Sequence, residues 1–386
     1  MAESTALARV GINATALLTP LTGIGQYTLQ LARAMGALLP QPPWLFYGGP
    51  WEREVRVPPP LPQDGVAARV KRAVPFGFEA ARFLQQRRFT AGARAQGLAL
   101  YHEPNFLAFR FAGPTVVTVH DLSWVRFPEM HPAERVRVMD GAMPKVVKDA
   151  AQIVVDSEFV RGEVIAHYGV APERVTTALL GVPPGFRVHA QEECAAVLAA
   201  HGLEFGRYLL AVGTLEPRKN LAAVVAAYAR LPEALRRRHP LVVVGMQGWG
   251  MDRLPGPMRR MMDAGEVRLL GYLPQEDLPK VYAGARLFAY PSVYEGFGLP
   301  PLEAMASGVP VIVSRRASLP EVVGEAGLLV EPADDVELAA RMRELIEDAP
   351  LHQRLRDAGL QRASGFTWQG CALRTLEVYR KALASG

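Results

Sequence analysis

The sequence has 386 residues, of which 49% are hydrophobic and 21% are charged, with a formal net charge of +5. This length predicts two or three domains, and the sequence has no apolar run of about 18 residues that would predict a transmembrane helix. Its two cysteines, Cys194 and Cys371, have no metal-binding spacing, which argues against a disulfide framework and suits a reducing compartment. The positive charge suits an anionic partner such as a nucleotide, an anionic lipid or a nucleic acid. Nucleic acid is the weakest of the three, because the sequence lacks zinc-finger spacings and RNA-binding aromatic motifs.

The N-terminal region predicts the start of an α/β domain. Its first residues lack a basic stretch followed by a long apolar run, so we expect no secretory signal and a cytoplasmic location, including the inner face of the plasma membrane. Residues 8–13 predict a strand, and Gly23-Ile24-Gly25 precedes a helix with apolar residues at helical spacing. This Gly-x-Gly lacks the third glycine of a dinucleotide fingerprint, so we reject a nicotinamide site.

Residues 66–97 combine basic and aromatic side chains on a predicted helix. Two interpretations remain open. The segment either contacts an anionic membrane surface or forms a solvated helix whose apolar side packs on the domain core. The basic residues, set against the single acid Glu79, are Arg69, Lys71, Arg72, Arg82, Arg87, Arg88 and Arg94.

Residues 115–119 (TVVTV) predict a buried strand that ends at His120 and Asp121. Ligands of open α/β sheets bind beyond the carboxyl ends of strands, so His120 is well placed for chemistry, although a single histidine is more often structural. Further strands are predicted at residues 153–155 and 175–180, and Asp156-Ser157-Glu158 is expected to cap the helix that follows the first of them.

The second half predicts another set of alternating strands and helices. Residues 208–212 predict a strand, and the turn after it carries Arg218 and Lys219. Two adjacent cations at a strand-to-helix turn can neutralise a diphosphate. The helix dipole repels cations at a helix start, so without an anionic ligand they would be disfavoured there. Residues 267–270 predict a strand that leads to Gly271 and Tyr272.

Residues 290–314 predict a strand, a loop, a helix and a strand. Gly298 lets the backbone approach a ligand closely, and the free N–H groups of Phe297 to Leu299 at the helix start favour an anion. Glu295 lies in the loop and Glu303 in the predicted first helical turn, and carboxylates accept hydrogen bonds from hydroxyl groups. A nucleotide-diphosphate sugar, with hydroxyl groups on either side of its phosphates, fits this arrangement.

The stretch PSVYEGFGLPPLEAMASGVPV, with seven residues between Glu295 and Glu303, resembles the signature of family 4 glycosyltransferases. That resemblance, together with alternating strands and helices, implies the α/β GT-B fold, in which two Rossmann-like domains with mostly parallel sheets face a central cleft. The expected domains are an acceptor-side domain at residues 1–190, a nucleotide-sugar-binding domain at 191–365, and a C-terminal helix at 366–386 that crosses back to the first domain.

The resemblance also implies roles for the candidate residues. Glu295 contacts the sugar hydroxyls and the developing positive charge, His120 contacts the donor sugar and phosphate, and Glu303 binds the ribose. Asp121 is expected either to orient His120 or to receive the acceptor. The remaining donor-binding candidates are Gly23, Gly25, Thr214, Arg218, Lys219, Gly271, Tyr272, Phe297, Gly298 and Leu299.

One position departs from the family pattern. An arginine is common beside the first glycine of the loop GTLEPRKN, and this chain has Thr214 there. Either Arg218 supplies the second cation beside Lys219, or the pyrophosphate is held less tightly.

The expected reaction is retaining hexosyl transfer without a cofactor or metal. VHDLSWVRFPEMHP together with GTLEPRKN resembles bacterial mannosyltransferases that use GDP-mannose in O-antigen or exopolysaccharide assembly. The expected acceptor is a glycan or a lipid-linked saccharide. A UDP- or dTDP-sugar donor, a nucleotide-sugar epimerase and an inactive scaffold with the same fold remain alternatives. A glycosidase, which would also use two carboxylates, is disfavoured because phosphate-binding elements lie between them.

Overall fold

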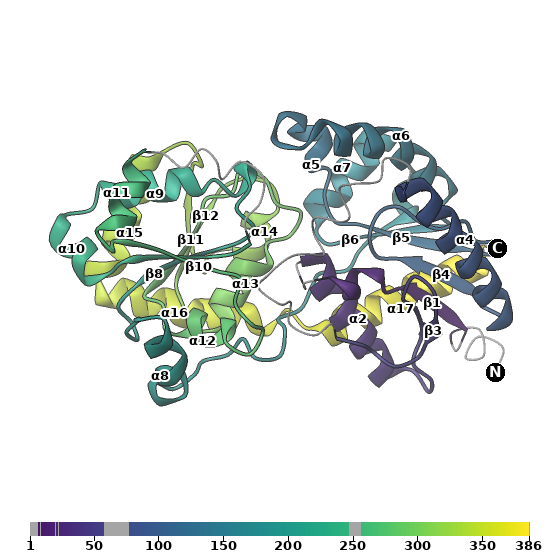
Figure 1. Ribbon diagram of the computed structural model, residues 1–386, viewed down its shortest axis with the longest axis horizontal. Coiled ribbons are helices and arrows are strands. Elements are labelled where there is room, and N and C mark those ends of the chain that lie inside the picture. The colour runs from purple at the N-terminus through teal and green to yellow at the C-terminus, as the bar shows by residue number, and fades with distance from the viewer. Residues whose placement is uncertain are drawn as a thin grey trace. The chain divides into compact units, whose positions relative to one another are not determined.

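The computed structural model describes residues 7, 9–19, 21, 23–57, 77–246 and 256–385 (Figure 1). The chain forms two compact units. Unit 1 consists of Met1–Leu122, Glu134–Gly181 and Trp368–Gly386, and unit 2 consists of Ser123–Ala133 and Val182–Thr367. The C-terminal segment from Trp368 therefore belongs to the same unit as the N-terminal segment.

Unit 1 contains a seven-stranded sheet in which only the pair β2–β3 is antiparallel. The strands in spatial order are β3 (Trp51–Glu52), β2 (Trp44–Phe46), β1 (Val10–Asn13), β4 (Leu100–Glu103), β5 (Thr115–Val119), β6 (Gln152–Val155) and β7 (Val175–Thr177). Strands β1, β4 and β6 are buried along their whole length, as expected for a sheet covered on both faces.

The helices of unit 1 pack on this sheet. They are α2 (Gly23–Leu38), α4 (Gly77–Ala95), α6 (Ala133–Asp149, whose first residue is assigned to unit 2), α7 (Glu158–Tyr168) and the C-terminal helix α17 (Trp368–Ala384). Helix α17 contacts α2 and strands β4, β5 and β6. The Tyr379 hydroxyl of α17 lies 2.7 Å from Nδ1 of His102 in β4, so a buried polar contact fixes the last helix to the sheet.

Unit 2 contains a six-stranded parallel sheet. Its spatial order is β10 (Val267–Gly271), β9 (Leu241–Val244), β8 (Leu209–Val212), β11 (Leu287–Tyr290), β12 (Val311–Ser314) and β13 (Leu328–Val330). Numbered along the chain, this is the order 3-2-1-4-5-6 of a Rossmann domain. The predicted fold class of two Rossmann-like α/β domains is confirmed.

Helices separate the strands of unit 2, and many of them pack on the sheet around an apolar core. They are α5 (Ser123–Arg126), α8 (Gln191–Ala200), α9 (Leu221–Ala229), α10 (Glu233–Arg238), α11 (Gly256–Asp263), α12 (Leu278–Ala283), α13 (Leu299–Ala306), α14 (Leu319–Val323), α15 (Asp335–Glu347) and α16 (Ala349–Ser364).

Glycines allow the carboxyl ends of three strands of unit 2 to lie close together. The Gly213 N–H donates to Val244 O and the Gly245 N–H donates to Gly271 O, each at 2.9 Å. A Cβ atom added at Gly245 would lie 1.9 Å from Gly213 O, a distance that backbone atoms cannot accommodate. Glycine is therefore required at position 245, directly after β9.

Two expected helix starts differ from the structure. Helix α13 begins at Leu299 and has no acidic residue in its first turn, so the prediction that Glu303 lies in that turn is wrong. Helix α2 already begins at Gly23, so Gly23 and Gly25 lie within its first turn rather than before it. A Cβ atom at Gly25 would lie 2.9 Å from a methyl group of Leu21, so a larger residue there would require this side chain to move.

Within the described part of the chain, we find no helix whose length and apolar character would let it cross a bilayer.

Candidate active site

The turn after β8 presents two cations. A short 3₁₀ helix, Pro217–Lys219, places Arg218 and Lys219 side by side, and Asn220 follows in the left-handed conformation with φ of 57°. The Asn220 side-chain amide donates to Pro291 O at 3.0 Å and to Pro332 O at 2.7 Å. The bond to Pro291 fixes the turn against the loop that follows β11, the neighbour of β8 in the sheet, and the bond to Pro332 fixes it against the segment that follows β13.

The carboxylate of Glu295, in the loop after β11, lies between the two cations. Its Oε1 is 2.8 Å from Nζ of Lys219, and its Oε2 is 3.0 Å from Nη1 of Arg218. The exposed fractions of the three side chains are 9% for Glu295, 12% for Arg218 and 17% for Lys219. Arg218 also donates to Tyr294 O at 2.6 Å and to Oε1 of Glu216 at 2.7 Å. We call Arg218, Lys219 and Glu295 the charge cluster.

Two hydroxyl groups complete the surroundings of Glu295. The hydroxyls of Tyr290 and Ser292 donate to Oε1 of Glu295 at 2.8 and 2.6 Å. Lys219 Nζ donates to the Tyr290 oxygen at 2.6 Å. Burial alone would raise the pKa of Glu295, but the charges of Arg218 and Lys219 and these hydrogen bonds lower it to about 2. Glu295 is therefore an ionised carboxylate at neutral pH.

The segment between Glu295 and α13 is held rigidly. The Ser318 hydroxyl lies 2.8 Å from Glu295 O and 2.7 Å from Phe297 O. Gly298 is the N-cap of α13 with φ of 116°, and a Cβ atom there would lie 2.7 Å from a methyl group of Leu319. Phe297 is buried against Phe366, with ring centroids 5.9 Å apart, and Leu299 is the first residue of α13. The phosphate seat at this helix start stays a prediction.

Glu303 lies apart from the charge cluster. It is buried on α13, and the described residues contain no ion pair to its carboxylate. Burial raises the pKa of Glu303 to about 7, and the neighbouring Tyr282 hydroxyl offsets part of that rise. Such a carboxyl group gains from ligand hydroxyls that can donate hydrogen bonds to it.

The other donor-binding candidates of unit 2 lie at the ends of strands. Thr214 borders a cavity of about 20 Å³ that Gly213, Lys219 and Tyr290 also line, which is enough space for a water molecule and not for a diphosphate. Gly271 ends β10 with φ of 70°, and the Tyr272 side chain after it is 44% exposed. Arg218 lies beside Lys219, where both contact Glu295, and its role as the second cation for a diphosphate stays a prediction.

His120 belongs to unit 1, where it follows β5. Its Nδ1 is 2.7 Å from Oδ2 of Asp156, and its Nε2 is 2.7 Å from Pro104 O. The carboxylate that orients the ring is therefore Asp156, whereas the sequence suggested Asp121. The N-cap of α7 is Ser157, within the expected capping stretch Asp156-Ser157-Glu158, and its hydroxyl accepts from the Val160 N–H.

The structure thus brings together only some of the candidate residues. Arg218, Lys219 and Glu295 are in direct contact, while Gly23 and Gly25 lie in unit 1 with His120. Sequence reasoning missed several residues that support them. Tyr290 and Ser292 stand within the stretch that resembles the family signature, and Asp156 directly follows a predicted strand. The position of each residue in the sequence was therefore a signal that it could belong to the site. The missed residues are Asp156, Glu216, Asn220, Tyr282, Tyr290, Ser292 and Ser318.

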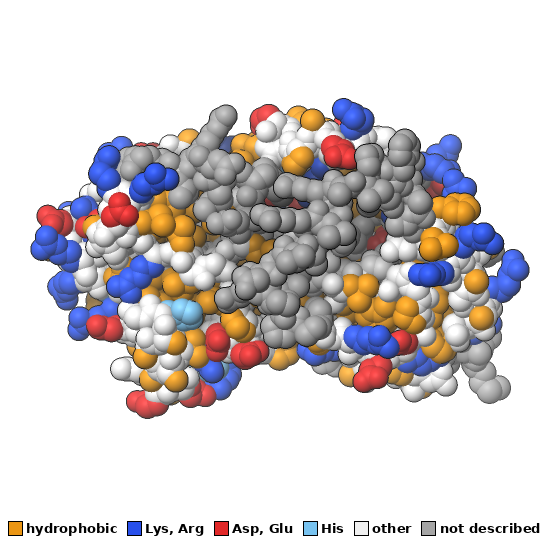
Figure 2. Space-filling model, viewed as in Figure 1, with side chains coloured by type: hydrophobic (Ala, Val, Ile, Leu, Met, Phe, Trp, Pro, Cys, Tyr) orange, Lys and Arg blue, Asp and Glu red, His pale blue; other side chains and the backbone are white. Residues whose placement is uncertain are grey.

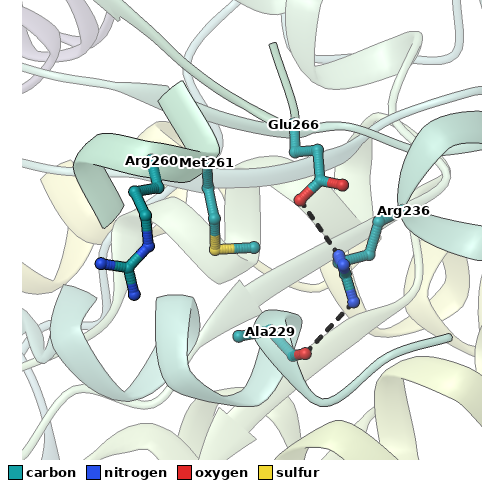
Figure 3. Close-up of a pocket in the computed structure, with 5 residues that line it drawn as sticks. All are labelled: Ala229, Arg236, Arg260, Met261 and Glu266. Carbon is teal, nitrogen blue, oxygen red and sulfur yellow. Dashed lines mark hydrogen bonds and ion pairs between the residues drawn. The ribbon is translucent and has the colours of Figure 1, made fainter. Parts of the chain in front are cut away.

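A larger pocket in unit 2, with a volume of about 290 Å³, lies elsewhere (Figure 3). Glu266, which lines it, directly precedes β10, and the Arg236 side chain donates to Oε2 of Glu266 at 3.1 Å and to Ala229 O at 3.2 Å. Ligands of parallel sheets bind at the carboxyl ends of strands, and this pocket lies at the amino end of β10. We do not assign it to the reaction. Its lining residues are Ala229, Arg236, Arg260, Met261 and Glu266.

Comparisons with known proteins agree with this geometry. Residues 201–362 match the family described as Glycosyl transferases group 1, and residues 21–186 match Glycosyltransferase Family 4. O-antigen chain mannosyltransferase B of Escherichia coli is 37% identical over 94% of this chain and 96% of its own length.

Two solved structures share the fold. WaaG, a glycosyltransferase involved in lipopolysaccharide biosynthesis, superimposes with a TM-score of 0.72 at 16% identity, over 96% of this chain and 99% of WaaG. HepE of Anabaena, solved in complex with UDP and glucose, gives a TM-score of 0.71 at 17% identity, over 96% of this chain and 99% of HepE.

The two Rossmann-like units and these structural neighbours show the GT-B fold. Within that fold class, the chain belongs to the family 4 glycosyltransferases.

Removing the carboxylate of the charge cluster should destabilise unit 2. Glu295→Ala leaves two largely buried cations without their shared anion, which costs about 3 kcal/mol or more of the free energy of unfolding. The matched control is Glu325→Ala, because Glu325 is exposed and no ion pair to it is found among the described residues. Urea unfolding at pH 7 measures both, and equal midpoints for the two variants would contradict the account.

Proposed function

We propose that this glycosyltransferase moves mannose from GDP-mannose, with retention at the anomeric carbon, onto a glycan or lipid-linked acceptor in cell-surface polysaccharide synthesis. The observation that carries the donor-binding part is the charge cluster at the carboxyl ends of β8 and β11. The proposal of mannose and of O-antigen synthesis is supported by the 37% identical relative, whose name is O-antigen chain mannosyltransferase B.

The strand order supports a ligand at the charge cluster. The order of the sheet reverses between β8 and β11, and ligands of open α/β sheets bind in the crevice at such a switch point. Lys219 and Arg218 follow β8, and Glu295 follows β11, so all three side chains stand at this point. We propose that it holds the diphosphate of the donor.

Donor binding then exchanges the partners of the two cations. A diphosphate carries more negative charge than one carboxylate, and arginine binds phosphate oxygens bidentately. In our proposal Arg218 and Lys219 turn to the phosphates, and the Glu295 carboxylate, freed from them, accepts hydrogen bonds from the sugar hydroxyls. The protein would thus store its phosphate-binding cations on Glu295 until the donor arrives.

The same residues account for the chemical step. The bond between the anomeric carbon and the phosphate oxygen breaks, the acceptor oxygen bonds to that carbon on the same face, and the acceptor proton passes to the leaving phosphate. Arg218 and Lys219 stabilise the negative charge on the diphosphate, and Glu295 stabilises the positive charge at the anomeric carbon. We expect these cations to allow the step to proceed without a bound metal. Metal independence and the catalytic role of His120 both stay predictions.

Transfer assays test the proposal directly. With an oligomannoside acceptor, the protein should release GDP from GDP-mannose and form an α-linked product. Lys219→Ala should lower kcat about 100-fold or more, because one of the two charges that stabilise the leaving group is lost. Lys145→Ala, at an exposed ion pair on α6, is the control and should keep full activity.

Transfer from UDP-glucose or a dTDP-sugar in place of GDP-mannose would refute the mannose assignment. Rearrangement of the nucleotide sugar without an acceptor would point to an epimerase. If the protein bound no nucleotide sugar, an inactive scaffold would be indicated.

We propose that Glu303 binds the ribose hydroxyls, because no cation among the described residues forms an ion pair with its carboxylate. In the free protein the pKa of Glu303 is about 7, and hydrogen bonds from the ribose favour the ionised form. Nucleotide binding at pH 7 should therefore release a fraction of a proton, and the affinity for GDP should fall as the pH drops below 7.

Calorimetry of GDP binding in two buffers of different ionisation enthalpy measures this proton release. Glu303→Gln should bind GDP more weakly and release no proton at this position. Proton release equal to that of the wild type in the Glu303→Gln variant would remove the ribose role.

Helix α4 supports a second proposal, contact with an anionic membrane. Its outer side exposes Phe83 (65%) and Leu84 (49%) near Arg87 and Arg88, and Figure 2 shows hydrophobic and basic side chains together in the region of α4. Exposed apolar and basic groups on one helix favour an anionic lipid surface.

The inner side of α4 packs on unit 1. Phe89 is fully buried in an aromatic cluster, and Arg82 donates to Leu107 O at 3.1 Å. The core-packing interpretation therefore holds for the inner side of the helix, while the membrane proposal concerns only the outer side. Arg69, Lys71 and Arg72 lie outside the described residues.

Charge reversal on α4 tests membrane contact. Arg87→Glu with Arg88→Glu should lower sedimentation with phosphatidylglycerol vesicles at least about tenfold, because each basic residue contributes roughly 1 kcal/mol. Arg237→Glu with Arg238→Glu on α10 changes the net charge equally and should bind like the wild type. Equal losses for both pairs would show that only net charge matters.

A further inference from the structure

A row of polar side chains follows the carboxyl ends of four neighbouring strands in unit 1. Asn13 ends β1, Glu103 ends β4, His120 follows β5 and Asp156 follows β6. Parallel strands end at the same edge of a sheet, so these residues lie next to each other although 143 positions separate the first from the last. Hydrogen bonds and one short stretch of backbone connect the row from Asn13 to Asp156.

The first half of the row fixes the loop after β4. The Asn13 side-chain amide lies 3.1 and 2.9 Å from the two oxygens of Glu103, the Tyr101 hydroxyl donates at 2.5 Å, and the Asn105 N–H donates at 2.9 Å. The Glu103 carboxylate is thus surrounded by donors. Because Asn105 is bonded to it, the preceding carbonyl of Pro104 is held in place.

The second half of the row fixes His120. Its Nε2 is 2.7 Å from Pro104 O, and a carbonyl oxygen can only accept, so Nε2 carries a hydrogen. Its Nδ1 is 2.7 Å from Oδ2 of Asp156, so a second proton lies between these two atoms. The rings of Tyr27 and Phe106 contact the imidazole edge-on, at 4.9 and 5.6 Å between centroids. The ring therefore cannot turn without breaking two short hydrogen bonds.

We propose that Asp156 is a positioning residue that holds His120 with hydrogens on both ring nitrogens, so that His120 acts as a fixed cationic group and not as a general base. A general base needs a free nitrogen lone pair, and neither nitrogen of this ring has one. The consequence for turnover rests on the proposed function, in which His120 is catalytic. The protonation state itself does not.

Among the groups around His120, the carboxylate of Asp156 is in direct contact with the ring. Burial lowers the pKa of the ring, but Asp156 and the bond to Pro104 outweigh this and raise it overall, with a smaller effect from Asp121. His102 is neutral, because burial and the charge of His120 lower its pKa to about 3. Burial also raises the pKa values of Tyr27 and Cys371, which are therefore uncharged at pH 7.

Asp156 depends on His120 in turn. Its side chain is almost completely buried, and its second oxygen, Oδ1, has no hydrogen-bond partner in the described part of the chain. Burial raises the pKa of Asp156, and the positive charge of His120 offsets part of that rise. The carboxylate is therefore kept in the interior by its partner ring, which is the relation expected of a dedicated pair.

Nitrogen-15 NMR of the donor-free protein tests the proposal without any substrate. In the wild type at pH 7 both ring nitrogens of His120 should give signals of protonated nitrogen. In Asp156→Asn the amide oxygen still accepts a hydrogen bond from Nδ1 but carries no charge, so the titration midpoint of His120 should fall by about 1–3 pH units. Asp149→Asn, at an exposed carboxylate on α6, should leave the midpoint unchanged.

Two results would overturn the proposal. One is a neutral His120 ring with an unprotonated nitrogen in the wild type at pH 7, which needs no variant to observe. The other is an unchanged midpoint in Asp156→Asn. In transfer assays, Asp156→Asn should lower kcat with little change in the KM for the donor, and it should have no further effect in a His120→Gln background. If the protein shows no transferase activity, the NMR result still decides the state of His120.

Discussion

The ion pairs of Glu295 with Arg218 and Lys219 are the interaction on which the proposed donor site depends. Two cations on one short turn would repel each other and lose hydration if they were buried alone. One carboxylate, supported by the hydroxyls of Tyr290 and Ser292, holds both in place. In our proposal, phosphate oxygens take these cations over from Glu295.

Sheet topology brings these distant residues together. In unit 2 the strand order reverses between β8 and β11, so the turn at residues 213–220 and the loop at 291–298 face one another although some seventy positions separate them. Unit 1 has the corresponding reversal between β1 and β4, where Asn13 binds Glu103. In both units, polar side chains gather where the parallel strands end, and Gly245 allows the close approach of β8 and β9 in unit 2.

Sequence reasoning reached the fold class and the residues of the charge cluster because their signals are local. The strand at residues 115–119 has the predicted bounds, and Arg218, Lys219 and Glu295 stand in recognisable turns. What it missed depends on which strands are neighbours. The stretch Asp156-Ser157-Glu158 indicated only a helix cap, which Ser157 provides, because the sequence does not show that β6 lies beside β5 and brings Asp156 to His120. Glu303 was misplaced by one turn because the bounds of a helix depend on cap geometry, here the left-handed Gly298.

The central claim is that the donor diphosphate replaces Glu295 as the partner of Arg218 and Lys219. A crystal structure of the protein with bound GDP tests it most directly. The account predicts phosphate oxygens within hydrogen-bonding distance of Lys219 Nζ and the Arg218 guanidinium, with the contact of 2.8 Å between Lys219 and Glu295 broken. A nucleotide bound elsewhere, with the charge cluster unchanged, would contradict it.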